Sequence, residues 1–394
     1  MNFPEELNGY FYPLVKSNSN VRSPQMIIMK NLSILLSLVI LSGCTSKMNQ
    51  PVSLLPETIK SFDIDFNWGE GGPNAFAAPG LWADADPQEH IKWYEELGCN
   101  VVQTFAVSCN GYAWYKNGII PEQPGLKHDF LTEMVELGHK KNMKVFGYFC
   151  AGSNTKWGTD HPDLSYGIPS SPHIPYTTQY LDYLCASIKD AIQKTKIDGF
   201  MIDWIWNPGS TREPYPPLKW LPCEQEMYAE LMNSPFPGID NLTPALVQEF
   251  RRKAIARCWK RVYTTTKETN PNCLIWVTCC DITSPDLVGS DIYKEADILM
   301  NEEGNVALIE EIRSLTGKHT RLLTCLANWN KQDPAEIIPQ AIKANIGLYG
   351  FTKPQVNSLL PPVSYYLSKP VTEFEGDNRN IACFARIYND LKIQ

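Results

Sequence analysis

The sequence predicts a single α/β domain of the (β/α)8 class, also called the TIM barrel. After residue 60, eight short apolar segments recur along the chain, and longer amphipathic segments separate them, which is the pattern of repeated β-α units. Such a barrel needs ~250 residues before insertions, and a chain of 394 residues has room for one. An open doubly wound sheet is the alternative. It is disfavoured because no glycine-rich phosphate loop follows the first strand segment.

The strand segments are short runs rich in apolar residues, and helical periodicity fills the intervals between them. Strands are predicted at 61–68, 100–108, 144–152, 198–206, 273–281, 296–303, 321–329 and 347–354. The clearest helix patterns cover 86–98, 127–142, 177–195 and 243–269. Segment 207–242, after the fourth strand, is rich in Pro, Trp and Tyr and is predicted to be a long loop. A loop of that length usually forms a wall or lid of a functional site.

The N-terminal part of the chain carries the signals of export. An apolar stretch at 32–41 is too short to span a bilayer, and it is followed by the sequence LSGC, which resembles the lipobox of bacterial lipoproteins. That resemblance implies lipidation of Cys44. We therefore expect residues 1–28 to be a mis-started extension, 29–43 a lipoprotein signal peptide, 44–60 the lipidated Cys and a linker, and 61–394 the barrel domain.

Composition narrows the classes of partner. The net charge is −8 and the Lys and Arg residues are scattered, so the chain offers no basic surface for a nucleic acid. The 11 Trp and 18 Tyr residues favour carbohydrate, whose apolar faces stack on aromatic rings. The cysteines form no CxxC pair, and the sequence contains no HExxH, calcium-loop or GxSxG motif. We therefore expect buried free thiols and no metal or cofactor.

In barrels of this class the functional side chains stand where strands end and βα loops begin. Polar and aromatic residues crowd the predicted carboxyl ends. The candidates for substrate binding are Asp65, Trp68, Trp114, Tyr115, Tyr148, Asn154, Trp157, His161, Trp204, Trp206, Asp281, Trp329 and Lys353.

Asp203 is the strongest catalytic candidate because it interrupts the apolar run of the fourth strand. A buried carboxylate is costly unless it is hydrogen-bonded or paired, so Asp203 is expected at the open end of the strand. The alternative is that Asp203 caps a turn or pairs with a buried Lys or Arg. Hydrolysis of a glycosidic bond needs two carboxyl groups.

The second carboxyl group is sought on the fifth and sixth strands. Glu302, Glu303 and Asp281 are the candidates, and Glu303 is slightly preferred. Side chains alternate along a strand, so Glu302 and Glu303 cannot both face the mouth. Alternatively, both glutamates only favour the dipole of the helix pattern that follows them.

Two segments resemble a known group of enzymes. Residues 113–149, which include PGLK, and the sequence IDGFMIDWIW at 197–206 resemble the barrels of bacterial glycoside hydrolases related to α-L-fucosidases. The second segment is similar to the fucosidase DGxxxD motif, and this resemblance implies that Asp203 is the nucleophile. A C-terminal β-sandwich and a histidine-rich sugar pocket, which that family usually has, are not evident, so the resemblance does not extend to fucose specificity.

The sequence thus favours a lipid-anchored glycoside hydrolase that works with retention and carries its anchor on the periplasmic side of the outer membrane. The alternative is an envelope lipoprotein that binds carbohydrate on the same barrel without catalysis. An isomerase or aldolase is less favoured, because no lysine at a strand end lies close to Asp203 in sequence, and Lys353 is left as a distant candidate. The sugar, the linkage and the oligomeric state remain open.

Overall fold

A computed structural model of the protein describes residues 55–69, 76–167, 173–205, 218–279, 281–327 and 331–390. Its eight strands form one closed parallel barrel in sequence order, and β1 pairs with β8 to close it. The predicted (β/α)8 class is therefore confirmed. The strands are β1 Lys60–Ile64, β2 Val101–Phe105, β3 Lys144–Cys150, β4 Gly199–Asp203, β5 Leu274–Cys279, β6 Ile298–Asn301, β7 Arg321–Leu326 and β8 Gly347–Thr352.

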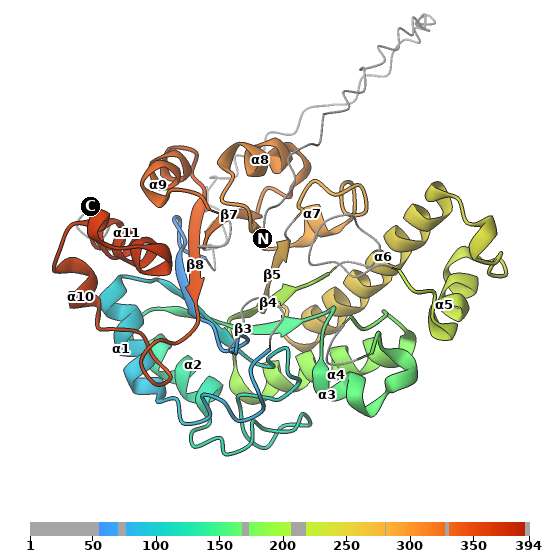
Figure 1. Cartoon of the computed structure of the whole chain (residues 1–394), viewed down its shortest axis with the longest axis horizontal. Coiled ribbons are helices and arrows are strands. Elements are labelled where there is room, and N and C mark those ends of the chain that lie inside the picture. Colours follow the sequence, from blue (N-terminus) through green and yellow to red (C-terminus); the bar gives the residue numbers. More distant parts are fainter. Residues whose placement is uncertain are drawn as a thin grey trace, which may run out of the picture. The chain divides into compact units, whose positions relative to one another are not determined.

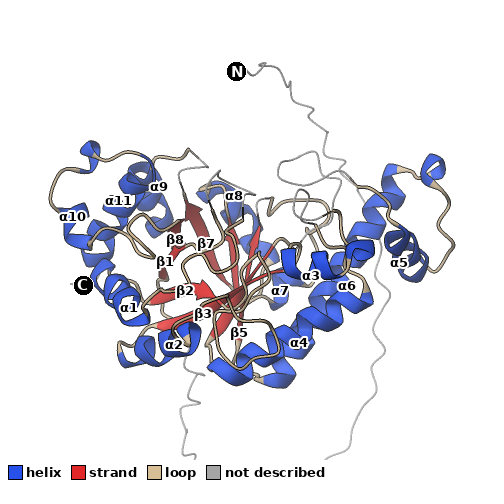
Figure 2. Ribbon diagram, turned by 60° about the horizontal axis from the view of Figure 1, so that its bottom comes forward, coloured by secondary structure: helices blue, strands red, loops and turns tan. Residues whose placement is uncertain are grey.

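Helices surround the barrel, and Figure 2 shows the red strands enclosed by them. Within the described residues they are α1 Pro87–Leu97, α2 Phe130–Lys140, α3 Thr155–Asp160, α4 Thr178–Thr195, α5 Pro222–Met232, α6 Pro244–Thr269, α7 Ile292–Glu295, α8 Val306–Glu311, α9 Pro334–Lys343, α10 Val363–Leu367 and α11 Gly376–Asp390. In this part of the chain we find no helix both long enough and apolar enough to cross a membrane.

Local signals in the sequence explain where the helices begin and end. Asp86 caps α1 by accepting bonds from the backbone N–H groups of Gln88 and Glu89, and Pro87 occupies the first helical turn. Gly98 ends the same helix in the left-handed conformation, with φ of 96°. Thr243 and Pro244 start α6 in the same manner. These caps fix the helices that hold each strand in place.

The barrel interior is filled by side chains from alternate strand positions. The ring of Trp276 on β5 lies 5.9 Å from that of Phe146 on β3 and 5.2 Å from that of Tyr349 on β8. These contacts across the barrel identify the inward-facing positions. Because side chains alternate, residues two places further along each strand also face inward, toward the carboxyl-end mouth.

The segment after β4 differs from the predicted loop. Helix α5 and the short 3-10 helix Ile239–Asn241 lie within 207–242, and α5 packs against α6 (Figure 1). Glu224 explains the start of α5, because its carboxylate accepts the backbone N–H of Leu221 at 2.8 Å and the Tyr166 hydroxyl at 2.6 Å. Residues 206–217 lie outside the described residues.

The predicted domain boundary also shifts slightly. Leu55 and Ile59, which were assigned to the linker, are 8% and 1% exposed and belong to the core. The structure therefore takes in at least part of the predicted linker. The remaining expectations for residues 1–54, including lipidation of Cys44, lie outside the described residues.

Candidate active site

Asp203 is the last residue of β4 and stands at the mouth of the barrel. Its carboxylate accepts the Tyr148 hydroxyl at Oδ2 (2.8 Å) and the backbone N–H of Trp204 at Oδ1 (2.7 Å). The side chain is half-buried. Both oxygens therefore have a donor, which is how a carboxyl group is held at the end of an apolar strand.

Glu302 is the second carboxyl group at this mouth. Its backbone N–H continues the barrel ladder by bonding to the Cys279 carbonyl at 3.2 Å, so strand alternation still applies at this residue. Thr278 lies two residues after the inward-facing Trp276, and its hydroxyl donates to the Glu302 carboxylate at 2.6 Å. Glu302 therefore faces the mouth.

The two carboxyl groups interact electrostatically. The pKa of Asp203 lies well above its ordinary value, first because of burial and second because of the negative charge of Glu302. The bonds from Tyr148 and Trp204 act in the opposite direction and favour the ionised form. Glu302 is thus coupled to Asp203, whereas the sequence had slightly favoured Glu303.

Two further aspartates stand on β1 and directly after it. Asp65 accepts the backbone N–H of Asn67 at 2.7 Å, and burial raises its pKa to about 7. Asp63 is 1% exposed, and burial together with the charge of Asp65 raises its pKa well above the ordinary value. Its Oδ1 atom has no hydrogen-bond partner among the described residues.

Asp63 was missed at the sequence level. The signal was present in the sequence DID, because residues 63 and 65 are two apart and share one face of a strand. Asp63, Asp65, Asp203 and Glu302 therefore form an acidic interior and mouth. At neutral pH such a group retains protons that isolated carboxylates would have lost.

An aromatic wall stands beside the carboxyl groups. Trp68 lies 5.6 Å from Phe76, ring to ring, and Phe76 lies 6.0 Å from Trp204. Trp204 has φ of 54°, a conformation that is uncommon for a large side chain. This turn directs the Trp204 backbone N–H back to Asp203. The Tyr176 hydroxyl donates a hydrogen bond of 2.7 Å to the Trp204 carbonyl.

Three predicted substrate contacts have structural roles instead. Trp114 is 1% exposed, with its ring stacked 4.4 Å from Phe66, and Tyr115 is fully buried with its hydroxyl 2.9 Å from Asp190. Neither ring has a free face for a sugar. Asn154 caps α3 by accepting the backbone N–H of Trp157 at 2.8 Å. The aromatic loop after β2 folds back into the core, which its composition alone did not reveal.

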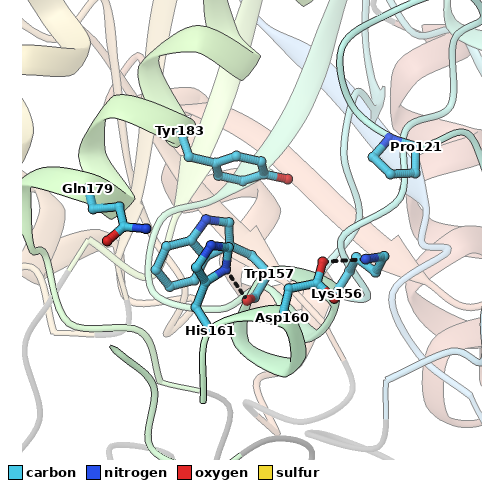
Figure 3. Close-up of a pocket in the computed structure, with 7 residues that line it drawn as sticks. All are labelled: Pro121, Lys156, Trp157, Asp160, His161, Gln179 and Tyr183. Carbon is cyan, nitrogen blue, oxygen red and sulfur yellow. Dashed lines mark hydrogen bonds and ion pairs between the residues drawn. The ribbon is translucent and has the colours of Figure 1, made fainter. Parts of the chain in front are cut away.

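Among the described residues, the other candidates form no hydrogen bond with Asp203 or Glu302. Asp281 is half-buried and accepts the Thr283 hydroxyl at 3.3 Å, while Lys353 is exposed. Trp157 and His161 line a separate pocket beside α3 and α4 (Figure 3). Trp206 and Trp329 lie outside the described residues. Within the described ranges, no cluster of three or more His, Cys, Asp or Glu side chains is arranged to hold a metal ion.

Comparison with known proteins gives one match in sequence. Residues 86–204, which run from just before α1 to just past Asp203, match the family described as "Hypothetical glycosyl hydrolase 6" (GHL6). A comparison with curated proteins found no match. The matched segment thus carries a glycosyl-hydrolase family signature.

Solved structures share the barrel. The chain is similar to alpha-L-fucosidase isoenzyme 2 from Paenibacillus thiaminolyticus, with 15% identity and a TM-score of 0.59 over 85% of this chain and 49% of that chain. It is similar to the beta-galactosidase from Bacillus circulans sp. alkalophilus, with 12% identity and a TM-score of 0.55 over 85% and 56% of the two chains.

A third similar structure is a single domain. The PgaB (BpsB) glycoside hydrolase domain from Bordetella bronchiseptica has 12% identity and a TM-score of 0.53 over 75% of this chain and 93% of that chain. The chain therefore spans about half the length of the fucosidase and most of the PgaB domain. The solved structures thus show the barrel fold, and the family match covers residues 86–204 of it.

Proposed function

We propose that the protein is a glycoside hydrolase in which Asp203 and Glu302 act as the two catalytic carboxyl groups. The observation that carries this proposal is their coupling: Asp203 and Glu302 stand at the mouth, and the charge of Glu302 raises the pKa of Asp203. A barrel that only binds carbohydrate has no need of two carboxyl groups in electrostatic contact. The match of residues 86–204 to a glycosyl hydrolase family supports the same reaction class.

In the proposed reaction Asp203 is the nucleophile and Glu302 is the acid and then the base. The Asp203 carboxylate attacks the anomeric carbon while Glu302 gives its proton to the departing glycosidic oxygen. Glu302 then takes a proton from water, the water oxygen attacks the anomeric carbon, and the bond to Asp203 breaks. The bonds from Tyr148 and Trp204 favour the charged form of Asp203 that this role needs.

We further propose that the configuration at the anomeric carbon is retained. Retaining enzymes hold their two carboxyl groups ~5 Å apart, and inverting enzymes hold them ~6.5–9.5 Å apart to admit a water molecule. The charge of Glu302 is second only to burial in raising the pKa of Asp203. Retention follows from the role proposed for Asp203, because only a retaining enzyme forms a bond between a carboxylate and the anomeric carbon.

Hydrolysis of a panel of aryl α- and β-glycosides by the full chain and by Asp203→Asn tests the proposal. The first two probes are an α-L-fucoside and a β-galactoside, the sugars in the names of two structurally similar enzymes. We expect turnover of at least one glycoside, its loss in Asp203→Asn, and a first product of unchanged anomeric configuration by NMR. Turnover that survives Asp203→Asn would refute the assignment, and an inverted product would refute the proposed retention.

Lipid anchoring through Cys44 on the periplasmic side of the outer membrane remains a separate proposal. It is supported by the apolar stretch at 32–41 and the LSGC sequence. Labelling of bacteria that express the full chain with a radioactive fatty acid tests it. We expect label in the wild type and none in Cys44→Ala, and label that persists in the variant would contradict the proposal.

A further inference from the structure

A pocket of mixed polar and aromatic lining lies between α3, α4 and the loop from β2 to α2 (Figure 3). Its volume of about 270 Å³ is close to the lower end of ligand pockets, ~300 Å³. The lining residues are Pro121, Lys156, Trp157, Asp160, His161, Gln179 and Tyr183. Neither Asp203 nor Glu302 is among them, so this pocket is separate from the candidate catalytic pair.

The pocket has a rigid pair of flat rings. The His161 imidazole stacks on the Trp157 indole with 4.2 Å between centroids and 17° between planes. Nδ1 of His161 lies 2.9 Å from the Trp157 carbonyl, and because a carbonyl only accepts, Nδ1 carries the proton of this bond. In the neutral ring Nε2 is then an acceptor. Nε2 has no bond to another described residue.

The rest of the pocket supplies hydrogen-bonding groups with little net charge. Gln179 on α4 is exposed, and its amide makes no hydrogen bond to the described residues. The Tyr183 hydroxyl accepts a long bond from Asn154 at 3.5 Å and keeps its own proton to donate. The Lys156 ammonium and the Asp160 carboxylate pair with each other, as the dashed line in Figure 3 shows.

This combination selects a class of ligand. The half-buried His161 ring, backed by the buried Trp157 indole, stands beside an amide and a phenol, and this set matches a neutral ligand whose hydroxyl groups both donate and accept. An anionic ligand would have to displace Asp160 from Lys156, and an apolar ligand would leave the amide and hydroxyl groups without partners. A sugar ring is neutral and carries several hydroxyl groups, so it avoids both problems.

A chain of hydrogen bonds connects helix α3, which lines the pocket, to Asp203. The backbone N–H groups of Thr155 and Lys156 bond to the carbonyls of Cys109 (2.9 Å) and Asn110 (3.1 Å). The Cys109 thiol lies 3.4 Å from the Tyr148 hydroxyl, which in turn donates to Asp203. Helix α3 is thus fixed to the same loop that contacts the catalytic site.

We propose that the pocket lined by Trp157, His161 and Gln179 is a subsite for a neutral sugar unit of the substrate, away from the bond that is cleaved. This proposal rests on the proposed hydrolase function and extends it, because it makes the substrate an oligosaccharide or a branched glycan. Simple aryl glycosides carry no second sugar unit to fill the subsite.

The test compares two glutamines on one helix. Gln179→Ala removes a pocket amide, and Gln193→Ala removes the same side chain at another exposed position of α4. The substrates are an aryl glycoside and an oligosaccharide ending in the same sugar. We expect Gln179→Ala to raise KM for the oligosaccharide roughly fivefold, the effect of one lost hydrogen bond, at unchanged kcat. Gln179→Ala should match the wild type on the aryl glycoside. Gln193→Ala should match the wild type on both substrates. His161→Ala should behave as Gln179→Ala does.

A binding measurement separates this proposal from the proposed function. The affinity for the same oligosaccharide is measured by calorimetric titration of Asp203→Asn and of its double variants with Gln179→Ala and with Gln193→Ala. If nothing is hydrolysed, fucosyl- and galactosyl-terminated trisaccharides are used instead. Weaker binding with Gln179→Ala alone supports the subsite even when no glycoside is cleaved. Equal affinity of the two glutamine variants, or no binding of any oligosaccharide, overturns it.

Discussion

At the scale of single residues, the pKa of Asp203 results from opposing effects in one place. Burial and the charge of Glu302 raise it, whereas the Tyr148 hydroxyl and the Trp204 N–H lower it. A nucleophile must be ionised, so these two donors are as important to the proposed reaction as the carboxyl group itself. The pH dependence of activity should report this balance.

Tyr148→Phe removes one of the donors and should raise the pKa of Asp203 further. Because the reaction needs ionised Asp203, the ascending limb of kcat/KM against pH should move up by about one pH unit, the effect of one bond to a charged group. Tyr115→Phe is the control, since that hydroxyl bonds to Asp190 in the fold. An ascending limb at the same pH in Tyr148→Phe would exclude this role.

Asp65 should destabilise the fold at neutral and alkaline pH. Its pKa rises from 3.8 unfolded to about 7 folded, so the folded chain holds a proton that the unfolded chain releases between these values. Stability contributed by protonated Asp65 is therefore lost as the pH rises from about 4 to 7. The loss is at most about 4.5 kcal/mol, at about 1.4 kcal/mol per pKa unit.

Asp65→Asn should consequently raise the free energy of unfolding at pH 8 and have little effect at pH 4, as measured by urea denaturation at both values. Asp84→Asn, at an exposed position, serves as the control and should change neither value. The explanation fails if Asp65→Asn changes stability equally at both pH values.

At the scale of elements, the close approach of β3 and β4 at their carboxyl ends positions the nucleophile. Gly152 follows β3, and a Cβ atom placed there would lie 2.7 Å from the Trp204 carbonyl oxygen and 3.0 Å from its Cβ. Only glycine leaves room for the turn that returns the Trp204 N–H to Asp203. This contact links a backbone position to the catalytic carboxyl group.

Gly152→Ala should therefore displace Trp204, lowering kcat/KM at least tenfold and stability by about 1–3 kcal/mol. Gly125→Ala is the matched control. A Cβ there meets nothing within 4 Å, but φ of +78° makes the residue strained, so stability should fall while kcat/KM is kept. Full activity in Gly152→Ala, at any stability, would contradict the role given to the turn.

The strands and helices also show which parts of the fold could be predicted from the sequence and which could not. All eight strand segments were found because apolar runs bounded by helical periodicity mark them, but their ends were placed too far along the chain: β4 ends at Asp203, where 206 was predicted. Glu302 and Glu303 are adjacent residues just beyond the end of β6, so only one of them can face the mouth. The bond from Thr278 on the neighbouring strand β5 identifies that residue as Glu302, and the sequence does not contain this information. Helix α5 was not predicted within 207–242, because the start of this helix is held by a bond between Glu224 and Tyr166, which is distant in sequence.

At the scale of the whole molecule, the closed barrel brings distant residues into one site. Asp65, Tyr148, Asp203 and Glu302 come from four regions of the chain that meet because parallel strands share their carboxyl ends. The sequence could predict this meeting place, but not which aromatic residues would reach it. Trp114 and Tyr115 turned inward to fill the core, whereas Trp68 and Trp204 remained at the mouth.

The most direct test of the proposed catalytic pair compares two adjacent glutamates. We would measure kcat/KM of Glu302→Gln and Glu303→Gln on glycosides with good and poor leaving groups. Glu302→Gln should lose about 10²–10⁴-fold on the poor leaving group, which needs an acid, and less on the good one. Glu303→Gln should stay within about twofold of the wild type, the range expected for a residue outside the catalytic pair. Loss of activity in Glu303→Gln with activity kept in Glu302→Gln would contradict the account.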